Sequence, residues 1–207
     1  MTGRAVLFIL LGYLSGGVMY AYHIPRLLTG GDVREQGADR NPGAANAFRL
    51  CGPTVGVLCA LLDVLKATLP VYAAAVYGGL RGLPLAAAAL APVLGHAYPV
   101  TLRFRGGKAI ASAFGALLGL WPVTHAVLLL AAIVLILLPL VHDHALLMLT
   151  SLCVFAVLTL NMAVHEAHLV AMGLLAIVGG RHLREARGAL EDIRARRQER
   201  QERRGAA

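Results

Sequence analysis

The sequence predicts an all-α, polytopic integral membrane protein with about seven transmembrane helices. Of its 207 residues, 58% are hydrophobic and only 14% are charged, and the mean hydropathy is +0.69. Soluble domains are roughly 45–50% apolar and about 25% charged. Apolar stretches long enough to cross roughly 30 Å of hydrocarbon recur along the chain. These observations place the chain among the membrane proteins.

Hydropathy divides the chain into predicted spans. They cover residues 5–22, 53–77, 84–102, 109–122, 123–141, 145–162 and 164–180. The first span follows a single Arg and is long enough to cross the membrane, so we interpret it as a helix rather than as a cleavable signal. The fourth span is short, and Pro122 and Pro139 make the boundaries near them approximate.

Basic residues predict the orientation of these spans. Nine Arg and five acidic residues lie between Arg181 and the end of the chain, which is typical of a cytoplasmic terminus beside anionic lipid headgroups. Seven spans, or five, then place the N-terminus outside, with residues 23–52 and 103–108 on the cytoplasmic side. We therefore divide the chain into a membrane-embedded domain, residues 1–180, and an Arg-rich cytoplasmic tail, residues 181–207.

Several other kinds of site are disfavoured. Nucleic-acid binding by the tail is the alternative to lipid contact, but the tail has no aromatic residues and its acids dilute its charge. The cysteines Cys51, Cys59 and Cys153 lack the paired spacing of a disulfide framework or a zinc site. Two histidine pairs could each seat a metal, but turn and interface histidines are commoner, so no metal or coenzyme is predicted. These pairs are His142 and His144 around Asp143, and His165 and His168 around Glu166.

The stretch "GHAYPVTLRFRGGKAIASAFG", residues 95–115, places His96, a Gly-Gly pair and three cations between apolar runs. The cations are Arg103, Arg105 and Lys108. Backbone N–H groups of Gly106 and Gly107 can approach an anion closely. Lys108 begins a predicted helix, whose positive dipole end also favours an anion. The loop is predicted to bind a phosphate or a carboxylate; alternatively, its cations only anchor helix ends on the positive-inside face.

The loop before the second span repeats this combination. Its segment "NPGAANAFR", residues 41–49, joins a turn-forming Asn-Pro-Gly, which includes Gly43, to Asn46 and Arg49. A solvated loop can have the same composition, so this segment alone indicates little.

Two ionisable residues lie inside the second span. Asp63 and Lys66 are three residues apart and therefore share one face of a helix. Ionisable groups at membrane depth are usually paired or functional. Either the pair neutralises itself, or Lys66 extends the basic pocket of the two loops.

In this order, the segments resemble the bacterial acyl-phosphate-dependent glycerol-3-phosphate acyltransferases from about residue 10 to about residue 120. The stretch "GGDVREQGADRNPGAANAFRLCG" is similar to the family loop that reads Asp-x-Arg, Gly-Ser-Gly-Asn, Gly-Ala-Thr-Asn and then Arg. "DVLKA" is similar to Asp-x-x-Lys-Gly, and "YLSGGVMYAY" to the first-helix motif. The strongest match is residues 95–115, which follow Gly-His-x-Phe-Pro … Phe-x-Gly-Gly-Lys nearly throughout.

The resemblance implies a reaction and its residues. Family members transfer an acyl group from acyl phosphate to the 1-hydroxyl of glycerol 3-phosphate, giving lysophosphatidate and phosphate in phospholipid biosynthesis. Because acyl phosphate is already activated, positioning and neutralising two anions beside membrane lipid could supply most of the rate. Arg49, Lys108 and His96 would be catalytic, with either His96 or a substrate phosphate oxygen taking the hydroxyl proton. The implied phosphate contacts are Asn46, Gly43, Gly106, Gly107, Arg103, Arg105 and Lys66.

Two departures from the family pattern bear on activity. Ala38 and Asp39 stand where the family has Ser and Gly, so a phosphate-binding hydroxyl is missing and a negative charge is added, which Arg40 could neutralise. The C-terminal motif keeps His182 but has Glu185 at the position of an Asn. The alternative function is therefore a catalytically inactive or re-purposed paralogue. An organic-phosphate transporter is a weaker alternative, because the two halves of the chain show no repeat.

Overall fold

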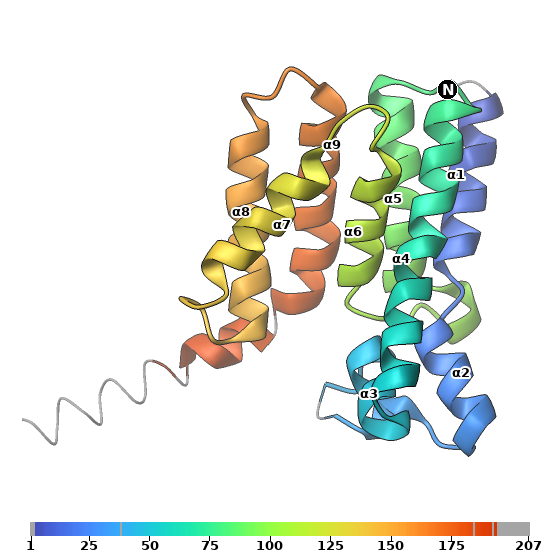
Figure 1. Cartoon of the computed structure of the whole chain (residues 1–207), viewed down its shortest axis with the longest axis vertical. Helices are drawn as coiled ribbons and strands as arrows, with labels where there is room; N and C mark the ends of the chain where they lie inside the picture. The colour runs from blue at the N-terminus through green and yellow to red at the C-terminus, as the bar shows by residue number, and fades with distance from the viewer. Residues whose placement is uncertain (1–2, 38, 184, 192, 194–207) are drawn as a thin grey trace, which may run out of the picture.

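Helices that alternate in direction run side by side along the long axis of the molecule (Figure 1). The computed structural model describes residues 3–37, 39–183, 185–191 and 193, and every regular element within them is helical. The α-helices are α1 (Gly3–Gly16), α2 (Tyr20–Thr29), α3 (Ala44–Cys51), α4 (Pro53–Val76), α5 (Gly82–Ala97), α6 (Ile110–Gly119), α7 (Ala126–Leu137), α8 (His144–Thr159) and α9 (His165–Leu174). Short 3-10 turns η1 (Val33–Glu35) and η2 (Val100–Leu102) and a π-helical turn η3 (Leu175–Gly179) complete the described elements. The prediction of an all-α fold is confirmed.

Each predicted span contains helical residues, but the helices differ in length. In the described part of the chain, three stretches are long and apolar enough to cross a membrane, namely Gly3–Thr29, Pro53–Val76 and Gly82–Leu102. Helices α6, α7 and α8 are apolar but shorter. At 1.5 Å per residue, the 10 residues of α6 extend only about 15 Å. The number of crossings and their orientation remain predictions.

Glycines allow neighbouring helices to approach closely. A Cβ on Gly95 in α5 would fall on the backbone carbonyl of Tyr13 in α1. A Cβ on Gly115 in α6 would likewise fall on the carbonyl of Val64 in α4. Since lipid tails are as apolar as Leu, such close backbone packing is a main source of helix association in a bilayer. These two glycines therefore permit the close packing of α1 on α5 and of α4 on α6.

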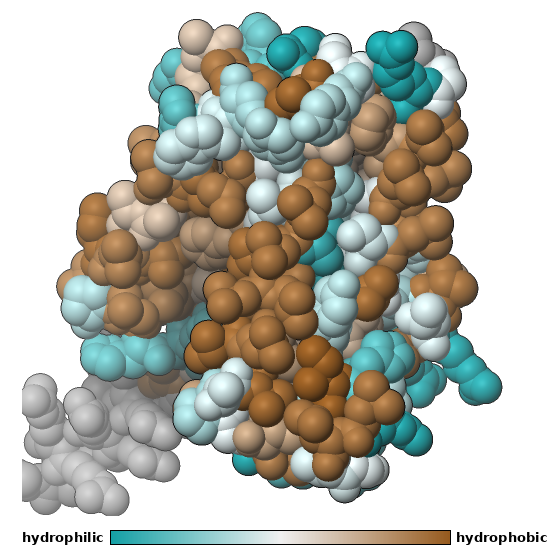
Figure 2. All heavy atoms as spheres, turned by 45° about the vertical axis from the view of Figure 1, so that its right-hand side comes forward, coloured by the Kyte–Doolittle hydropathy of each residue, from teal (hydrophilic) through white to brown (hydrophobic). Residues whose placement is uncertain are grey.

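Large apolar side chains cover the outside of the bundle. Residues more than half exposed include Leu7, Leu14, Leu61, Leu69 and Leu135. Figure 2 shows apolar residues over most of the visible face, with polar residues gathered toward the two ends. Soluble monomers rarely expose so large an apolar area. The surface is therefore suited to contact lipid, in agreement with the membrane prediction.

Both loops singled out in the sequence lie at one end of the bundle, opposite the start of α1 (Figure 1). We call this the loop end. The first loop contains more helix than predicted, because α2 extends into it and η1 and α3 lie within it. The chain beyond η3 also reaches the loop end and stays helical through residues 180–183 and 185–191. His182 and Ala186 are buried there, so the predicted tail begins with residues that pack against the bundle. The domain division at residue 180 remains a prediction.

Candidate active site

A cavity of about 520 Å³ lies at the loop end, and we call it the inner cavity. Its wall contains five of the residues predicted for the site, namely Gly43, Asn46, Arg49, His96 and Lys108. They come from α3 and the residue before it, from the last turn of α5, and from the segment before α6. The fold therefore brings together the two loops that the sequence singled out.

Helix α3 positions the asparagine and the arginine of the first loop. It begins after Gly43, whose backbone is extended, and ends before Gly52, which has a φ of +83°. Asn46 is buried; it donates a hydrogen bond to the carbonyl of Asn41 at 2.8 Å and accepts one from Nη1 of Arg49. Within the residues that the structure describes, Arg49 forms no ion pair. Its charge is thus held in place by a neutral group and remains available to an anion.

Lys108 lies between two carboxylates. Its Nζ atom is 2.8 Å from Oδ2 of Asp39 and 2.8 Å from Oε2 of Glu185. Partial burial lowers the pKa of the ammonium, but hydrogen bonds to these two carboxylates outweigh it and raise the pKa of Lys108. Burial likewise raises the pKa of Asp39, but bonds from Lys108 and the Asn41 N–H outweigh it and lower that pKa. Lys108 and Asp39 are therefore both charged at neutral pH.

Two expectations for these residues are wrong. Lys108 does not begin the helix, because α6 starts at Ile110 and Ala109 has a φ of +62°. This left-handed conformation cannot belong to an α-helix. Asp39 pairs with Lys108, whereas the sequence suggested Arg40 as its partner.

His96 lies in the wall of the inner cavity, beside a buried ion pair. Its Nδ1 atom is 3.8 Å from Oδ1 of Asp63, and that oxygen is 2.7 Å from Nζ of Lys66. Lys66 also donates a hydrogen bond to the carbonyl of Val18 at 2.6 Å. The side chains of Asp63 and Lys66 are each 2% exposed. Lys66 is not part of the cavity wall, so this geometry favours a self-neutralising pair over a phosphate contact.

The Gly-Gly pair fixes the loop against the end of α5. The N–H of Gly107 donates to the carbonyl of His96 at 3.0 Å, and the N–H of Gly106 donates to that of Ala97 at 3.2 Å. These amides are therefore engaged by the helix end, contrary to the expectation that they would face an anion. A Cβ on Gly107 would fall on Nε2 of His96. Arg181 holds the pair from beyond η3, because it donates to both glycine carbonyls at 3.2 and 2.6 Å.

The other two cations of this loop lie outside the inner cavity. Arg105 and Gly106 line a second cavity of about 810 Å³, which we call the outer cavity. Arg103 is exposed and ends η2 with a φ of +51°. Phosphate binding by Arg103 and Arg105 remains a prediction.

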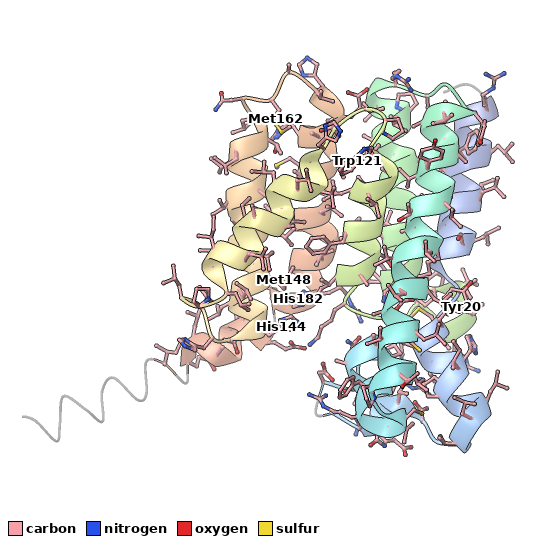
Figure 3. The ribbon with its side chains drawn as sticks, in the orientation of Figure 1. Tyr20, Trp121, His144, Met148, Met162 and His182 are labelled. Atoms are coloured by element: carbon pink, nitrogen blue, oxygen red, sulfur yellow. The ribbon has the colours of Figure 1, made fainter. Side chains whose placement is uncertain are left out.

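The residues of the inner cavity that were not predicted as site residues include Asp39, Asp143, His144 and Glu185. Asp143 caps α8 by accepting a hydrogen bond from the N–H of Leu146 at 2.9 Å. The His144 ring lies 6.0 Å from that of His182 (Figure 3). No group of three or more His, Cys, Asp or Glu suited to a metal ion occurs among the described residues. Asp39 and Glu185 were visible in the sequence as departures from the family motifs; Ala38, the other departure in that loop, lies outside the described residues.

Comparison with known proteins decides the family. A model of the family described as glycerol-3-phosphate acyltransferase matches residues 6–191 of the 207. The chain belongs to this family. The resemblance drawn from the sequence motifs is confirmed, and the match extends well beyond the part of the chain that carries those motifs.

The sequences of two named members of the family are similar to this chain. The glycerol-3-phosphate acyltransferase of Thermotoga petrophila is 45% identical over 117 residues, which are 56% of this chain and 59% of that protein. That of Myxococcus xanthus is 44% identical over 119 residues, 55% of this chain and 59% of that protein. The chain thus matches less than two thirds of the length of these relatives.

Solved structures of the family share the fold over nearly the whole chain. PlsY, an integral membrane glycerol 3-phosphate acyltransferase in its glycerol 3-phosphate form, has a TM-score of 0.81 and 28% identity, with 92% of this chain and 94% of that chain covered. Its lysophosphatidic acid form has a TM-score of 0.79 and 27% identity. Because it shares this fold and has helices apolar enough to cross a membrane, the chain is an integral membrane protein.

Proposed function

We propose that the protein is an acyltransferase that moves an acyl group from acyl phosphate to the 1-hydroxyl of glycerol 3-phosphate. The products are 1-acyl-glycerol 3-phosphate, or lysophosphatidate, and inorganic phosphate. The names of the relatives support this proposal, because they describe glycerol-3-phosphate acyltransferases. The two PlsY structures are described as glycerol 3-phosphate and lysophosphatidic acid forms. We propose that the same two compounds are the acceptor and the product of this protein.

The observation that carries the proposal is the wall of the inner cavity. It presents Arg49, Lys108 and His96 to one volume, although the three residues lie on separate segments of the chain. Two cations suit a reaction in which both substrates carry a phosphate group. The imidazole beside them supplies a group that can orient the acceptor or take its proton.

The proposed reaction needs no covalent enzyme intermediate. The 1-hydroxyl oxygen of glycerol 3-phosphate attacks the acyl carbon, and the bond between that carbon and the phosphate oxygen breaks. The hydroxyl proton passes to His96 or to a phosphate oxygen of a substrate, and phosphate leaves. Arg49 and Lys108 neutralise negative charge as the phosphate departs. Holding both substrates in one cavity removes much of the entropic barrier.

The membrane supplies the acyl donor in this proposal. Acyl phosphate is an amphiphile, and the apolar surface of the bundle would lie in the same lipid as its chain. The loop end would face the cytoplasm, where glycerol 3-phosphate is dissolved. The membrane would be the inner or plasma membrane of the cell, and the Arg-rich end of the chain would lie beside its anionic headgroups.

A phosphate-release assay tests the proposal. The purified protein in detergent receives palmitoyl phosphate with and without glycerol 3-phosphate, and released phosphate is measured. We expect release that depends on the acceptor and falls at least about tenfold in Lys108→Ala, because loss of one positioned hydrogen-bond donor to a developing negative charge typically costs about 10²–10³ in rate. His165→Ala is the matched control, since His165 is exposed at the start of α9 and away from the cavity.

The contacts of Lys108 favour a second candidate, a re-purposed paralogue of the same fold. Asp39 and Glu185 both contact Lys108, and both stand where the family motifs carry uncharged residues. Such a site disfavours a dianionic phosphate and could suit another acceptor. A folded sample that releases no phosphate, beside an active family member, would support this candidate and contradict the first.

A further inference from the structure

The outer cavity carries a concentration of arginines. It measures about 810 Å³ and is lined by four Arg and two acidic residues, together with Gly37, Phe104 and Gly106. The charged residues are Asp32, Arg34, Glu35, Arg40, Arg105 and Arg181. Guanidinium groups bind phosphate well because their planar donors match two of its oxygens.

The inner cavity has the opposite balance of charge. Its two cations, Arg49 and Lys108, share the wall with four carboxylates. These are Asp39, Asp63, Asp143 and Glu185. Even with the Asp63 charge neutralised by Lys66, acids outnumber cations there. A phosphate dianion arriving from water is therefore attracted more strongly to the outer cavity than to the inner one.

Two of the four arginines are fixed by other protein groups. Arg34 is paired with Asp32, and its guanidinium carbon lies 4.8 Å from the centre of the Tyr22 ring. Arg181 donates to the carbonyls of the Gly-Gly pair and lies 5.6 Å from the centre of the Tyr98 ring. These contacts give the cavity a preformed basic wall.

The other two arginines of the outer cavity, Arg40 and Arg105, differ from Arg34 and Arg181 in their contacts. Among the residues that the structure describes, Arg40 and Arg105 form no ion pair. They approach the cavity from the two different loops. Arg40 has a φ of +48° and Phe104 has a φ of +61°, a conformation that non-glycine residues adopt at a cost and often at functional sites. Arg40 and Arg105 are thus the groups best placed to bind a ligand in the outer cavity.

A third cavity borders both the outer cavity and the inner one. It measures about 410 Å³ and shares Arg40 and Arg181 with the outer cavity. It shares Asp39, Lys108 and Glu185 with the inner cavity. The three cavities are therefore neighbours, and the third and the inner one both border the proposed catalytic lysine.

We propose that the outer cavity is a second phosphate-binding site, in which Arg40 and Arg105 bind a phosphate group outside the catalytic site. The identification of the ligand as glycerol 3-phosphate on its way to Lys108 rests on the proposed function. The site itself does not, because its chemistry fits any phosphate monoester or inorganic phosphate. The phosphate of an anionic lipid headgroup has the same chemistry and is the other source.

The test uses radiolabelled inorganic phosphate as the probe and no acyl donor, so that the result is independent of acyl transfer. The full chain is purified in detergent free of phospholipid, and bound phosphate is measured by equilibrium dialysis. We expect the wild type to bind one phosphate that depends on Lys108 and a second that does not. In Arg40→Gln and in Arg105→Gln the second phosphate should bind about tenfold more weakly, since charge-assisted hydrogen bonds to phosphate are strong.

Control variants separate a site from a general effect of charge. Arg187→Gln makes the same change at an exposed residue of the helix beyond η3 and should keep both phosphates. Arg105→Lys keeps the charge and should retain part of the affinity. Equal weakening in Arg187→Gln and Arg105→Gln would overturn the proposal, because it would show that only net charge matters.

Lipid discs distinguish the two sources. The dialysis is repeated in discs of phosphatidylcholine and of phosphatidylglycerol. Retention of the second phosphate in both discs supports a site for soluble phosphate, and its loss only in phosphatidylglycerol supports occupation by a lipid headgroup. A wild type that binds no phosphate, or only the one that depends on Lys108, in detergent and in both discs would overturn the proposal. Absence of acyl transfer would leave these results unchanged.

Discussion

The ammonium group of Lys108 lies 2.8 Å from the carboxylate of Glu185, although 77 positions separate the two residues in the chain. Asp39 contacts the same ammonium at 2.8 Å. Two carboxylates therefore surround the group that the proposed reaction assigns to phosphate. A substrate phosphate must compete with them for Lys108.

Removing the charge of Glu185 should ease this competition. We expect Glu185→Gln to lower the KM for glycerol 3-phosphate by about two- to fivefold. The estimate is modest because the Glu185 side chain is 38% exposed, and ion pairs at such positions contribute roughly 0.2–1 kcal/mol. Steady-state kinetics with palmitoyl phosphate at saturation measure the effect.

The control is Glu191→Gln, which removes the same charge at an exposed position further along the helix. It should leave the KM unchanged. An increased KM in Glu185→Gln would show instead that Glu185 positions Lys108 for the substrate, and the idea of competition would be wrong.

The contact between Asp39 and Lys108 predicts how stability depends on pH. Hydrogen bonds from Lys108 and the Asn41 N–H, which outweigh burial, place the pKa of the Asp39 carboxyl below its usual range. A group with a lowered folded-state pKa stabilises the protein above its unfolded pKa of about 3.9, and this contribution is lost as the pH falls through the folded pKa. The Tm of the wild type should therefore fall more steeply than that of Asp39→Asn as the pH drops below about 4.

The measurement is a series of Tm values in detergent for both proteins across this pH range. Lys108 acts in the opposite sense, because its pKa is raised and its contribution is lost only as the pH rises above the usual lysine range. Neither contribution should change near neutral pH. If the Tm of the wild type and that of Asp39→Asn fell equally steeply at acid pH, the contact between Asp39 and Lys108 would be contradicted.

Hydropathy predicted the helices because residues such as Leu14 and Leu69 must face lipid wherever the chain crosses it. It could not predict α3, which is short and lies in a polar loop. Nor could it place Lys108 before α6, because the left-handed backbone of Ala109 depends on how the loop closes on α5.

The site was predictable to a similar extent. The motifs identified Arg49, Lys108 and His96, which the inner cavity brings together. They also showed Asp39 and Glu185 as departures, but the meeting of these two at Lys108 is a tertiary contact with no local signal. The Gly106 and Gly107 amides looked available for an anion because the sequence does not show that α5 ends beside them.

The buried pair in α4 predicts a large loss of stability on single substitution. Lys66→Met would leave the Asp63 carboxylate buried without its partner, and the free energy of unfolding should fall by roughly 3–5 kcal/mol. Asp63→Leu combined with Lys66→Met removes both charges and should recover most of that loss, because buried pairs are often replaceable by apolar residues. Thermal denaturation of each variant in detergent measures both changes in stability.

The same variants separate the two interpretations of Lys66. If Lys66 binds substrate phosphate, Lys66→Met should raise the KM with little loss of stability. The double variant Asp63→Leu with Lys66→Met would then keep the raised KM. The 2.7 Å contact with Asp63 and the 2% exposure of both side chains favour the first outcome.

Gly107 should be the position in the Gly-Gly pair at which a methyl group most directly disturbs the proposed chemistry. In Gly107→Ala the new Cβ would fall on Nε2 of His96, and the ring cannot move away freely because its side chain is only 4% exposed. A displacement of about 1 Å can cost about 10²-fold in rate, so acyl transfer should fall by at least about tenfold while the protein still folds. Gly188→Ala is the matched control, since a Cβ there meets no atom within 4 Å. If Gly107→Ala kept full activity and its fold, the His96 ring could shift without consequence, and the substrate phosphate would become the better candidate for the base.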